Sequence, residues 1–114
     1  MGWLSFFEKE IQTTEDHKNK DYVTHFYFDP QDKVISEIES LFKEMGIRIN
    51  DIDKVRGEII FSSSSLEGTI TLTSDTGRIG VDITVCASGI FNIGKPKNFV
   101  MNLYRGLDKK LNRR

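Results

Sequence analysis

Apolar and polar residues alternate strictly over residues 78–88, and this is the clearest pattern in the chain. Every odd position from Ile79 to Ala87 is apolar, whereas the even positions are charged, small or sulfur- or hydroxyl-bearing. Successive side chains of a strand point to opposite faces, so the pattern predicts a strand with one buried side and one solvent-facing side. Residues 66–73 alternate in the same way between apolar or glycine positions and threonine or glutamate. Two neighbouring strands with a shared apolar face are therefore expected.

The register of these two strands can be argued from the residues between them. Residues 74–77 favour a turn, in which Gly77 suits a positive φ. If Leu72 lies opposite Ile79, the apolar residues of both strands fall on one face, and a slip of one residue would break that match. The opposite face of the sheet would then be flat, small and rich in hydroxyl groups.

Two segments have the spacing of amphipathic helices. Between Pro30 and Gly46 the apolar residues recur every three or four positions. Asp29 suits the N-cap, Pro30 suits the first helical position, and Gly46 can end the helix in the left-handed conformation. A second helix is expected to begin at Pro96 and to carry an apolar stripe as far as Leu111.

The N-terminal segment, residues 1–12, also has a helical pattern. Trp3, Phe7 and Ile11 follow one another at intervals of four residues, which predicts a short amphipathic helix. This helix would dock on its own domain or on a second copy. A membrane-surface anchor is an alternative, although the polar side of the segment is not basic. Residues 13–21 are mostly charged or hydroxylic and are expected to form an exposed loop.

Three further segments favour strands, namely residues 21–28, 47–50 and 55–61. The predicted fold class is α+β, a two-layer sandwich with a mainly antiparallel sheet of about four strands. The helices would pack on one face of the sheet, in the order α-β-α-β-β-β-α. We expect one domain over residues 1–114, in which residues 22–112 form the α+β core.

Composition and cysteine usage indicate an ordinary globular domain. The chain has 114 residues, of which 38% are hydrophobic and 29% charged, so it can bury a core without crosslinks. The single cysteine, Cys86, cannot form an internal disulfide, which favours a reducing, cytoplasmic location. No apolar run approaches the roughly 20 residues that span a bilayer, and the N-terminus does not resemble a secretory signal.

Candidate catalytic and metal-binding residues are few. His17 lies in the charged loop, His25 lies within a predicted strand, and Cys86 alternates onto the polar side of its strand. The glycines do not have the spacing of a phosphate-binding loop. We therefore expect no enzymatic activity, no cofactor and no metal site.

The charge of the chain is unevenly distributed. Residues 95–114 have a net charge of +6, whereas residues 1–94 have a net charge of −7. Basic residues near a helix C-terminus can simply complement the helix dipole, or they can bind the phosphates of a nucleic acid or a lipid surface. The acidic remainder of the chain and the lack of an aromatic platform on the polar sheet face argue against a nucleic acid. The candidate anion-binding residues are Lys95, Lys97, Arg105, Lys109, Lys110, Arg113 and Arg114.

The polar sheet face leads to the expected function. A flat surface of small hydroxylic side chains can receive another chain with little loss of side-chain entropy, although threonine is also common on exposed strands. We expect a non-catalytic protein-interaction or self-association module, with a homodimer as one form. Binding of a small ligand between sheet and helices is a further alternative. The candidate interaction residues are Trp3, Phe7, Thr69, Thr71, Thr73, Asp82 and Thr84.

Overall fold

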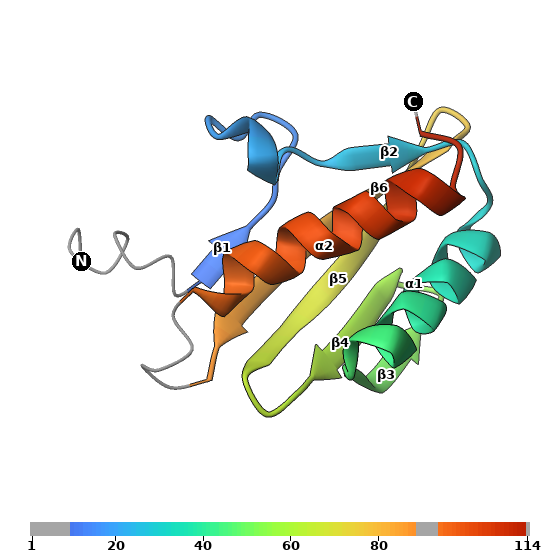
Figure 1. Ribbon diagram of the computed structural model, residues 1–114. Helices are drawn as coiled ribbons and strands as arrows, with labels where there is room; N and C mark the ends of the chain where they lie inside the picture. Colours follow the sequence, from blue (N-terminus) through green and yellow to red (C-terminus); the bar gives the residue numbers. More distant parts are fainter. Residues whose placement is uncertain (1–9, 89–93, 114) are drawn as a thin grey trace.

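A six-stranded antiparallel sheet forms one layer of the molecule and two helices form the other (Figure 1). The computed structural model describes residues 10–88 and 94–113. The strands are β1 (Glu10–Gln12), β2 (His25–Tyr27), β3 (Arg48–Asp53), β4 (Glu58–Ser62), β5 (Leu66–Asp75) and β6 (Arg78–Ala87). The helices are α1 (Gln31–Met45), α2 (Lys95–Lys110) and a short 3-10 turn, η2 (Lys20–Tyr22).

Strand β6 organises the sheet. It pairs with β5 over its whole length on one side, and with both β1 and β2 on the other. β1 lies opposite residues 84–86 of β6, and β2 lies opposite residues 79–81. Residues 13–24 leave the sheet between these two short strands and return to it. Beyond β5 the order continues through β4 to β3.

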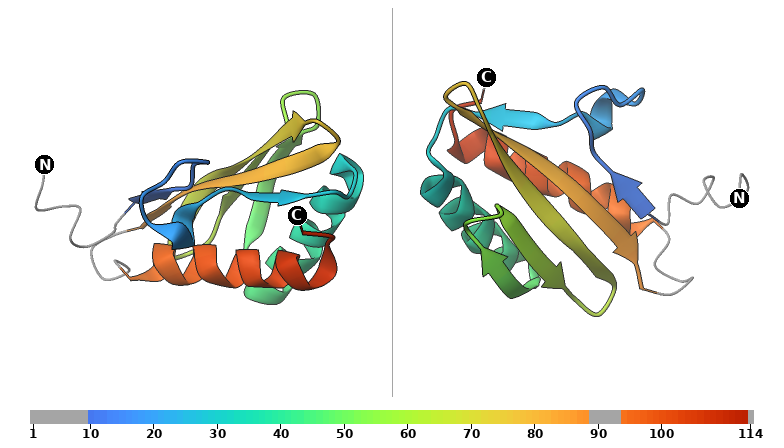
Figure 2. Two further views of the ribbon diagram at one scale, coloured as in Figure 1. Left: turned by 90° about the horizontal axis from the view of Figure 1, so that it is seen from above. Right: turned by 180° about the vertical axis from the view of Figure 1, so that it is seen from behind.

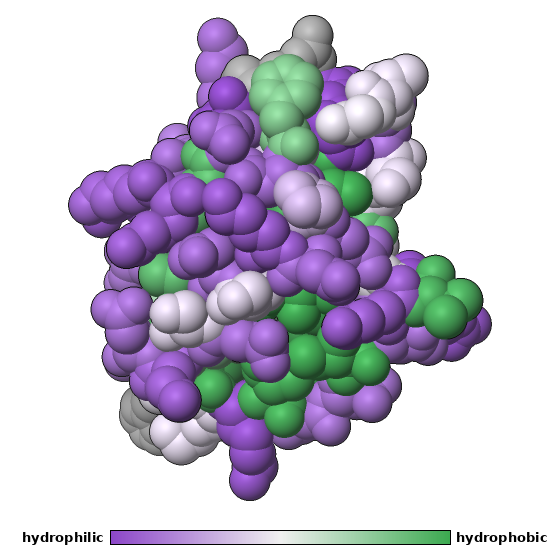
Figure 3. Space-filling view, turned by 90° about the vertical axis from the view of Figure 1, so that its right-hand side faces the viewer, coloured by the Kyte–Doolittle hydropathy of each residue, from purple (hydrophilic) through white to green (hydrophobic). Residues whose placement is uncertain are grey.

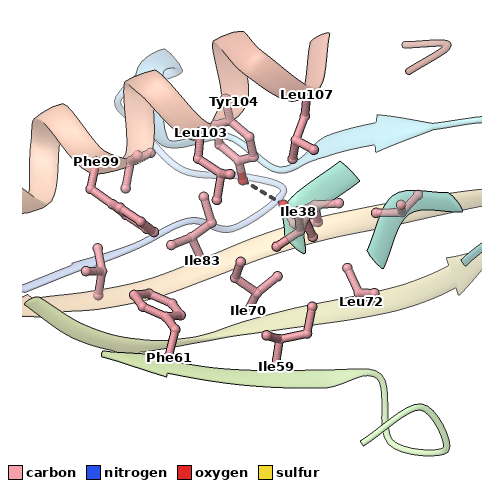
Figure 4. Close-up of a cluster of buried hydrophobic side chains, with 14 of the residues drawn as sticks. Ile38, Ile59, Phe61, Ile70, Leu72, Ile83, Phe99, Leu103, Tyr104 and Leu107 are labelled. Carbon is pink, nitrogen blue, oxygen red and sulfur yellow. Dashed lines mark hydrogen bonds between the residues drawn. The ribbon is translucent and has the colours of Figure 1, made fainter. Parts of the chain in front are cut away.

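Both helices cover the same face of the sheet (Figure 2). The other face, which no described helix covers, is called the open face below. Large apolar side chains from β4, β5 and β6 point toward those of α1 and α2 and fill the space between the layers (Figure 4). The side seen in Figure 3 is mostly hydrophilic, with hydrophobic atoms in patches. The largest fully buried side chains include Tyr27, Ile38, Phe42, Ile59, Phe61, Ile70, Ile83, Leu103 and Leu107.

The predicted α+β class with an antiparallel sheet and helices on one face is confirmed, but the strand count and element order are not. The sheet has six strands rather than about four. The expected helix over residues 1–12 is wrong for its described part, because residues 10–12 form β1. Ile11 lies opposite Val85 and is buried, while its two neighbours are exposed, which is the alternation of an edge strand. Residues 1–9, with Trp3 and Phe7, lie outside the described part of the chain.

The turn between β5 and β6 is tighter than expected. Thr76 and Gly77 alone form it, with φ of 44° and 79°, so Asp75 pairs with Arg78. Two central residues with positive φ match the right-handed twist of the flanking strands. Leu72 therefore lies opposite Val81 rather than Ile79. The predicted register was wrong by two residues, but a shift of two keeps every side chain on its predicted face.

The strand expected over residues 55–61 begins later, at Glu58. The Asp53 carboxylate accepts hydrogen bonds from the backbone N–H groups of Val55 and Arg56, at 3.1 and 3.0 Å. Gly57 follows with φ of 73°, so these residues form a turn and the Val55 side chain is 98% exposed. The hydrogen bonds of the Asp53 side chain to the local backbone therefore outweigh the strand propensity of valine.

Helix α1 ends at Gly46 in the left-handed conformation, as predicted, but Asp29 is not its N-cap. Pro30 occupies the cap position without a side-chain hydrogen bond. The buried Asp29 carboxylate instead accepts the Asn112 backbone N–H at 2.6 Å and lies 3.1 Å from Lys33 Nζ. It thereby ties the end of the chain to the β2–α1 connection.

The stability of the protein is expected to fall in acid partly because of Asp29. Burial raises the pKa of this carboxyl, but the Asn112 amide and Lys33 outweigh it, so the pKa lies below its ordinary value. A lowered pKa in the folded state stabilises the fold above the unfolded-state pKa of about 3.9, and this contribution is lost as pH falls through the folded-state pKa. Urea denaturation should show that the free energy of unfolding of Asp29→Asn falls less between pH 7 and pH 3 than that of the unmodified protein. Asp32→Asn, at an 81% exposed side chain, is the control and should keep the original slope.

Candidate functional site

A polar groove crosses the open face of the sheet over β5 and β6. The right-hand view of Figure 2 shows this face, with the excursion of residues 13–24 standing beside β6. The groove has a volume of about 860 Å³. Its lining comprises Gln12, Thr13, Thr14, Glu15, Asp16, Thr24, Phe26, Thr71, Thr73, Ser74, Asp75, Gly80, Asp82 and Thr84.

Thr13 marks the point at which the chain leaves β6. Its backbone N–H still donates to Ile83 O at 2.9 Å, but the Ile83 N–H donates to Thr13 Oγ1 at 2.8 Å instead of to a backbone carbonyl. The hydroxyl therefore replaces a bond of the strand ladder and releases the backbone to turn away. The same hydroxyl donates to Asp82 Oδ1 at 2.9 Å. Thr24, where the chain returns, donates to that oxygen at 2.5 Å. Asp82 thus holds both ends of the excursion.

A tyrosine of α2 reaches the base of the groove from the helical layer. Tyr104 Oη donates to Val81 O at 2.6 Å and lies 3.0 Å from Thr13 Oγ1. Figure 4 draws one hydrogen bond of Tyr104 as a dashed line. Burial raises the pKa of Tyr104 above its ordinary value, so the hydroxyl stays a neutral donor. The groove is therefore anchored to the core and not only to the sheet.

The groove is acidic. Four carboxylates line it, and its lining contains no lysine, arginine or histidine. Asp75 is paired with Arg78 at 2.8 Å, but within residues 10–88 and 94–113 Asp82, Glu15 and Asp16 have no cationic partner. Arg78 lies with its guanidinium 3.8 Å from the centre of the Phe26 ring, at the rim. A positively charged ligand is the complement of this surface.

The predicted interaction residues divide between two places. Asp82, Thr71, Thr73 and Thr84 line the groove together. Thr69 lies in a separate hollow of about 370 Å³ between β4 and β6, which Thr84 also borders. Sequence reasoning missed the wall of the groove, formed by residues 12–16, together with Thr24 and Phe26. The run of hydroxylic and acidic residues from Thr13 to Asp16 was a signal for it, but only pairing with β6 places that run beside Asp82.

The basic residues predicted to bind anions are not brought together as one surface. Arg105 and Lys109 border a hollow of about 380 Å³ on the helical side of the molecule. Arg113 binds Asp108 at 3.0 Å. Lys95, Lys97 and Lys110 are exposed and line neither this hollow nor the groove. Arg114 lies outside the described residues.

Among the described residues, no three His, Cys, Asp or Glu side chains are grouped as they would be to hold a metal ion. No described helix is long and apolar enough to cross a membrane. Comparison with profiles of protein families, with curated proteins and with solved structures finds no match to this chain.

Proposed function

We propose that this protein is a non-catalytic binding module whose acidic groove holds a lysine- or arginine-containing segment of a partner protein. The observation that carries the proposal is the lining of the groove, with four carboxylates and no basic side chain. Opposite charges across an interface speed association and select the partner. The occupant is therefore a protein segment with closely spaced positive charges.

The floor of the groove supports an extended segment rather than a bulky one. Thr71, Thr73 and Thr84 of β5 and β6 form it, and these short side chains lose little side-chain entropy when they are covered. Thr13 and Thr24 of the wall are buried and already hydrogen-bonded to Asp82, so the groove keeps its shape before a partner arrives. A preformed surface lowers the ordering cost of binding.

A ten-residue peptide of alternating lysine and serine is a direct probe of the groove. Its affinity, measured by isothermal titration calorimetry at low salt, should fall about fivefold in the double variant Glu15→Gln, Asp16→Asn. Each exposed ion pair contributes up to about 1 kcal/mol, and both carboxylates are exposed, so the fold should be unaffected. The control is Glu39→Gln, an exposed carboxylate of α1 on the other layer. Equal weakening by the control would contradict the proposal, since attraction would then come from overall charge.

A second copy of the chain is the competing occupant, because its basic helix α2 could supply the cations. Light scattering at rising concentration separates the two cases. A mass that rises in the unmodified protein but not in the double variant would identify self-association through the groove. A constant monomer mass together with peptide binding would support a separate partner.

A further inference from the structure

A second hollow lies on the helical side of the molecule, where η2, β2 and α2 meet. It has a volume of about 380 Å³, within the range of small-molecule sites. Its lining mixes three basic side chains and two carboxylates with one imidazole, a tyrosine and an apolar methionine. The lining comprises Lys20, Asp21, His25, Met101, Tyr104, Arg105, Asp108 and Lys109.

The imidazole of His25 is held in a fixed orientation. Its Nδ1 lies 3.0 Å from Asp108 Oδ1, and its ring stacks on Tyr104 with 3.7 Å between centroids and 5° between planes. A ring that donates through Nδ1 to a carboxylate presents its other nitrogen to the opposite side. No hydrogen bond is formed by Nε2, and no buried side-chain nitrogen or oxygen of the described residues lacks a partner. The Nε2 atom therefore has access to solvent, and His25 is one of the residues that border the hollow.

The negative charge of Asp108 is already compensated. Besides His25, the carboxylate accepts the hydroxyl of Tyr27 at 2.7 Å and binds Arg113 at 3.0 Å. Of the two acids that line the hollow, Asp21 is therefore the one whose charge would oppose the binding of an anion. A carboxylate with so many donors does not repel an incoming anion as a free one would.

Three basic side chains around the hollow are available to bind an anion. Lys20, Arg105 and Lys109 are exposed, and none forms an ion pair with any described residue. Arg105 and Lys109 are four residues apart on α2 and so project from one side of the helix. Lys20 reaches the same hollow from η2. The hollow is thus positive, in contrast to the groove on the other face of the sheet.

We propose that this hollow binds a phosphate monoester, with the phosphoryl oxygens toward Lys20, Arg105 and Lys109, and toward His25 once Nε2 takes up a proton on binding, and with the ester group against Met101. Several donors arranged around one position suit a dianion with three acceptor oxygens better than a carboxylate with two. The half-buried Met101 gives an apolar contact for the organic part. This site is independent of the acidic groove.

Binding should be visible in the titration of His25. Burial lowers the pKa of this imidazole, and Asp108 opposes that effect. The charged or titratable groups that face it are Asp108, Tyr27, Tyr104 and Arg113, with Lys20, Asp21, Arg105 and Lys109 around the hollow. A bound dianion stabilises the imidazolium, so its pKa should rise when the ligand is present.

Phenyl phosphate is the probe, followed through the ring protons of the two histidines by NMR. The His25 signal should move saturably at pH 7.5 and its titration midpoint should rise, while the signal of His17, which does not line the hollow, should move less. Inorganic phosphate should bind more weakly, because it lacks the ester group. Lys109→Gln should weaken phenyl phosphate about fivefold, and the matched variant Lys110→Gln, outside the hollow, should not. Equal effects of the two variants, equal shifts of both histidines, or no saturation at millimolar ligand would each overturn the proposal.

Discussion

Replacement of Phe61 with alanine is expected to destabilise the fold by about 3–5 kcal/mol, the usual cost of removing a large buried aromatic side chain. Phe61 is 1% exposed. Its ring lies 5.2 Å from that of Phe42 in α1 and 5.0 Å from that of Phe99 in α2, so it joins β4 to both helices (Figure 4 shows it beneath Phe99). The loss would be read from the free energy of unfolding in guanidinium chloride.

Ile60 provides the matched control for this prediction. It is the neighbouring residue of β4, but it points to the open face and is 41% exposed. Ile60→Ala should change the free energy of unfolding by less than about 1 kcal/mol. If Phe61→Ala does not fold, Phe61→Leu should still show a measurable loss, since leucine only partly fills the space. Equal losses at positions 60 and 61 would show that the sheet is not covered on one face only.

Replacement of Asp82 with alanine should be the most damaging change on the open face, with a loss of about 3 kcal/mol. Hydrogen bonds to charged groups contribute roughly 1.5–3 kcal/mol each, and Asp82 accepts two of them, from Thr13 and Thr24. Both threonines are buried, so their hydroxyls would be left without this acceptor. Thermal or chemical denaturation would measure the effect.

The control for Asp82 is Thr73→Ala, at an exposed groove residue of the neighbouring strand, which should stay within about 0.5 kcal/mol of the unmodified protein. A double-mutant cycle with Thr24→Val would isolate the bond itself, because the second change should cost much less once Asp82 is gone. Additive losses in that cycle would contradict the role of Asp82 as the common acceptor. Asp82→Ala should also weaken binding of the lysine–serine peptide, since it removes one carboxylate of the groove.

The structure places an acidic groove and a basic hollow on opposite sides of the sheet. Glu15, Asp16, Asp75 and Asp82 gather on the open face of the sheet. Arg105 and Lys109 lie on α2, on the other side of the sheet. The two proposals therefore make independent predictions, one for a cationic segment and one for a phosphate monoester. Failure of either leaves the other standing.

Local patterns were sufficient for the two long helices and for strands β5 and β6. The alternation around Ile79 and Leu72, and the helical spacing between Pro30 and Gly46, each reflect a periodicity that neighbouring residues share. Such periods assign a face to every side chain, and those assignments survived even where the strand register was wrong by two residues. The polar residues predicted for the open face are there for the same reason.

The N-terminal excursion and both candidate sites depend on contacts that no local pattern contains. Ile11 belongs to a strand because β6 offers an unpaired edge, and three residues are too few to show a period. Thr13 meets Asp82 across 69 positions of sequence, and His25 meets Asp108 across 83. Nothing in the residues next to His25 indicates that its ring will stack on Tyr104 of α2.

By itself, the sequence determined the two helices, the paired strands on either side of Gly77 and the division of their side chains between a dry and a polar face. These follow from backbone geometry, which repeats every two or every 3.6 residues. Only the tertiary structure decided that residues 10–12 form a strand, that residues 13–16 build the wall of an acidic groove, and that His25 lies against Asp108 and Tyr104. Those outcomes arise from pairing and packing between segments far apart in the chain, where the partner rather than the residue's own neighbours selects the conformation.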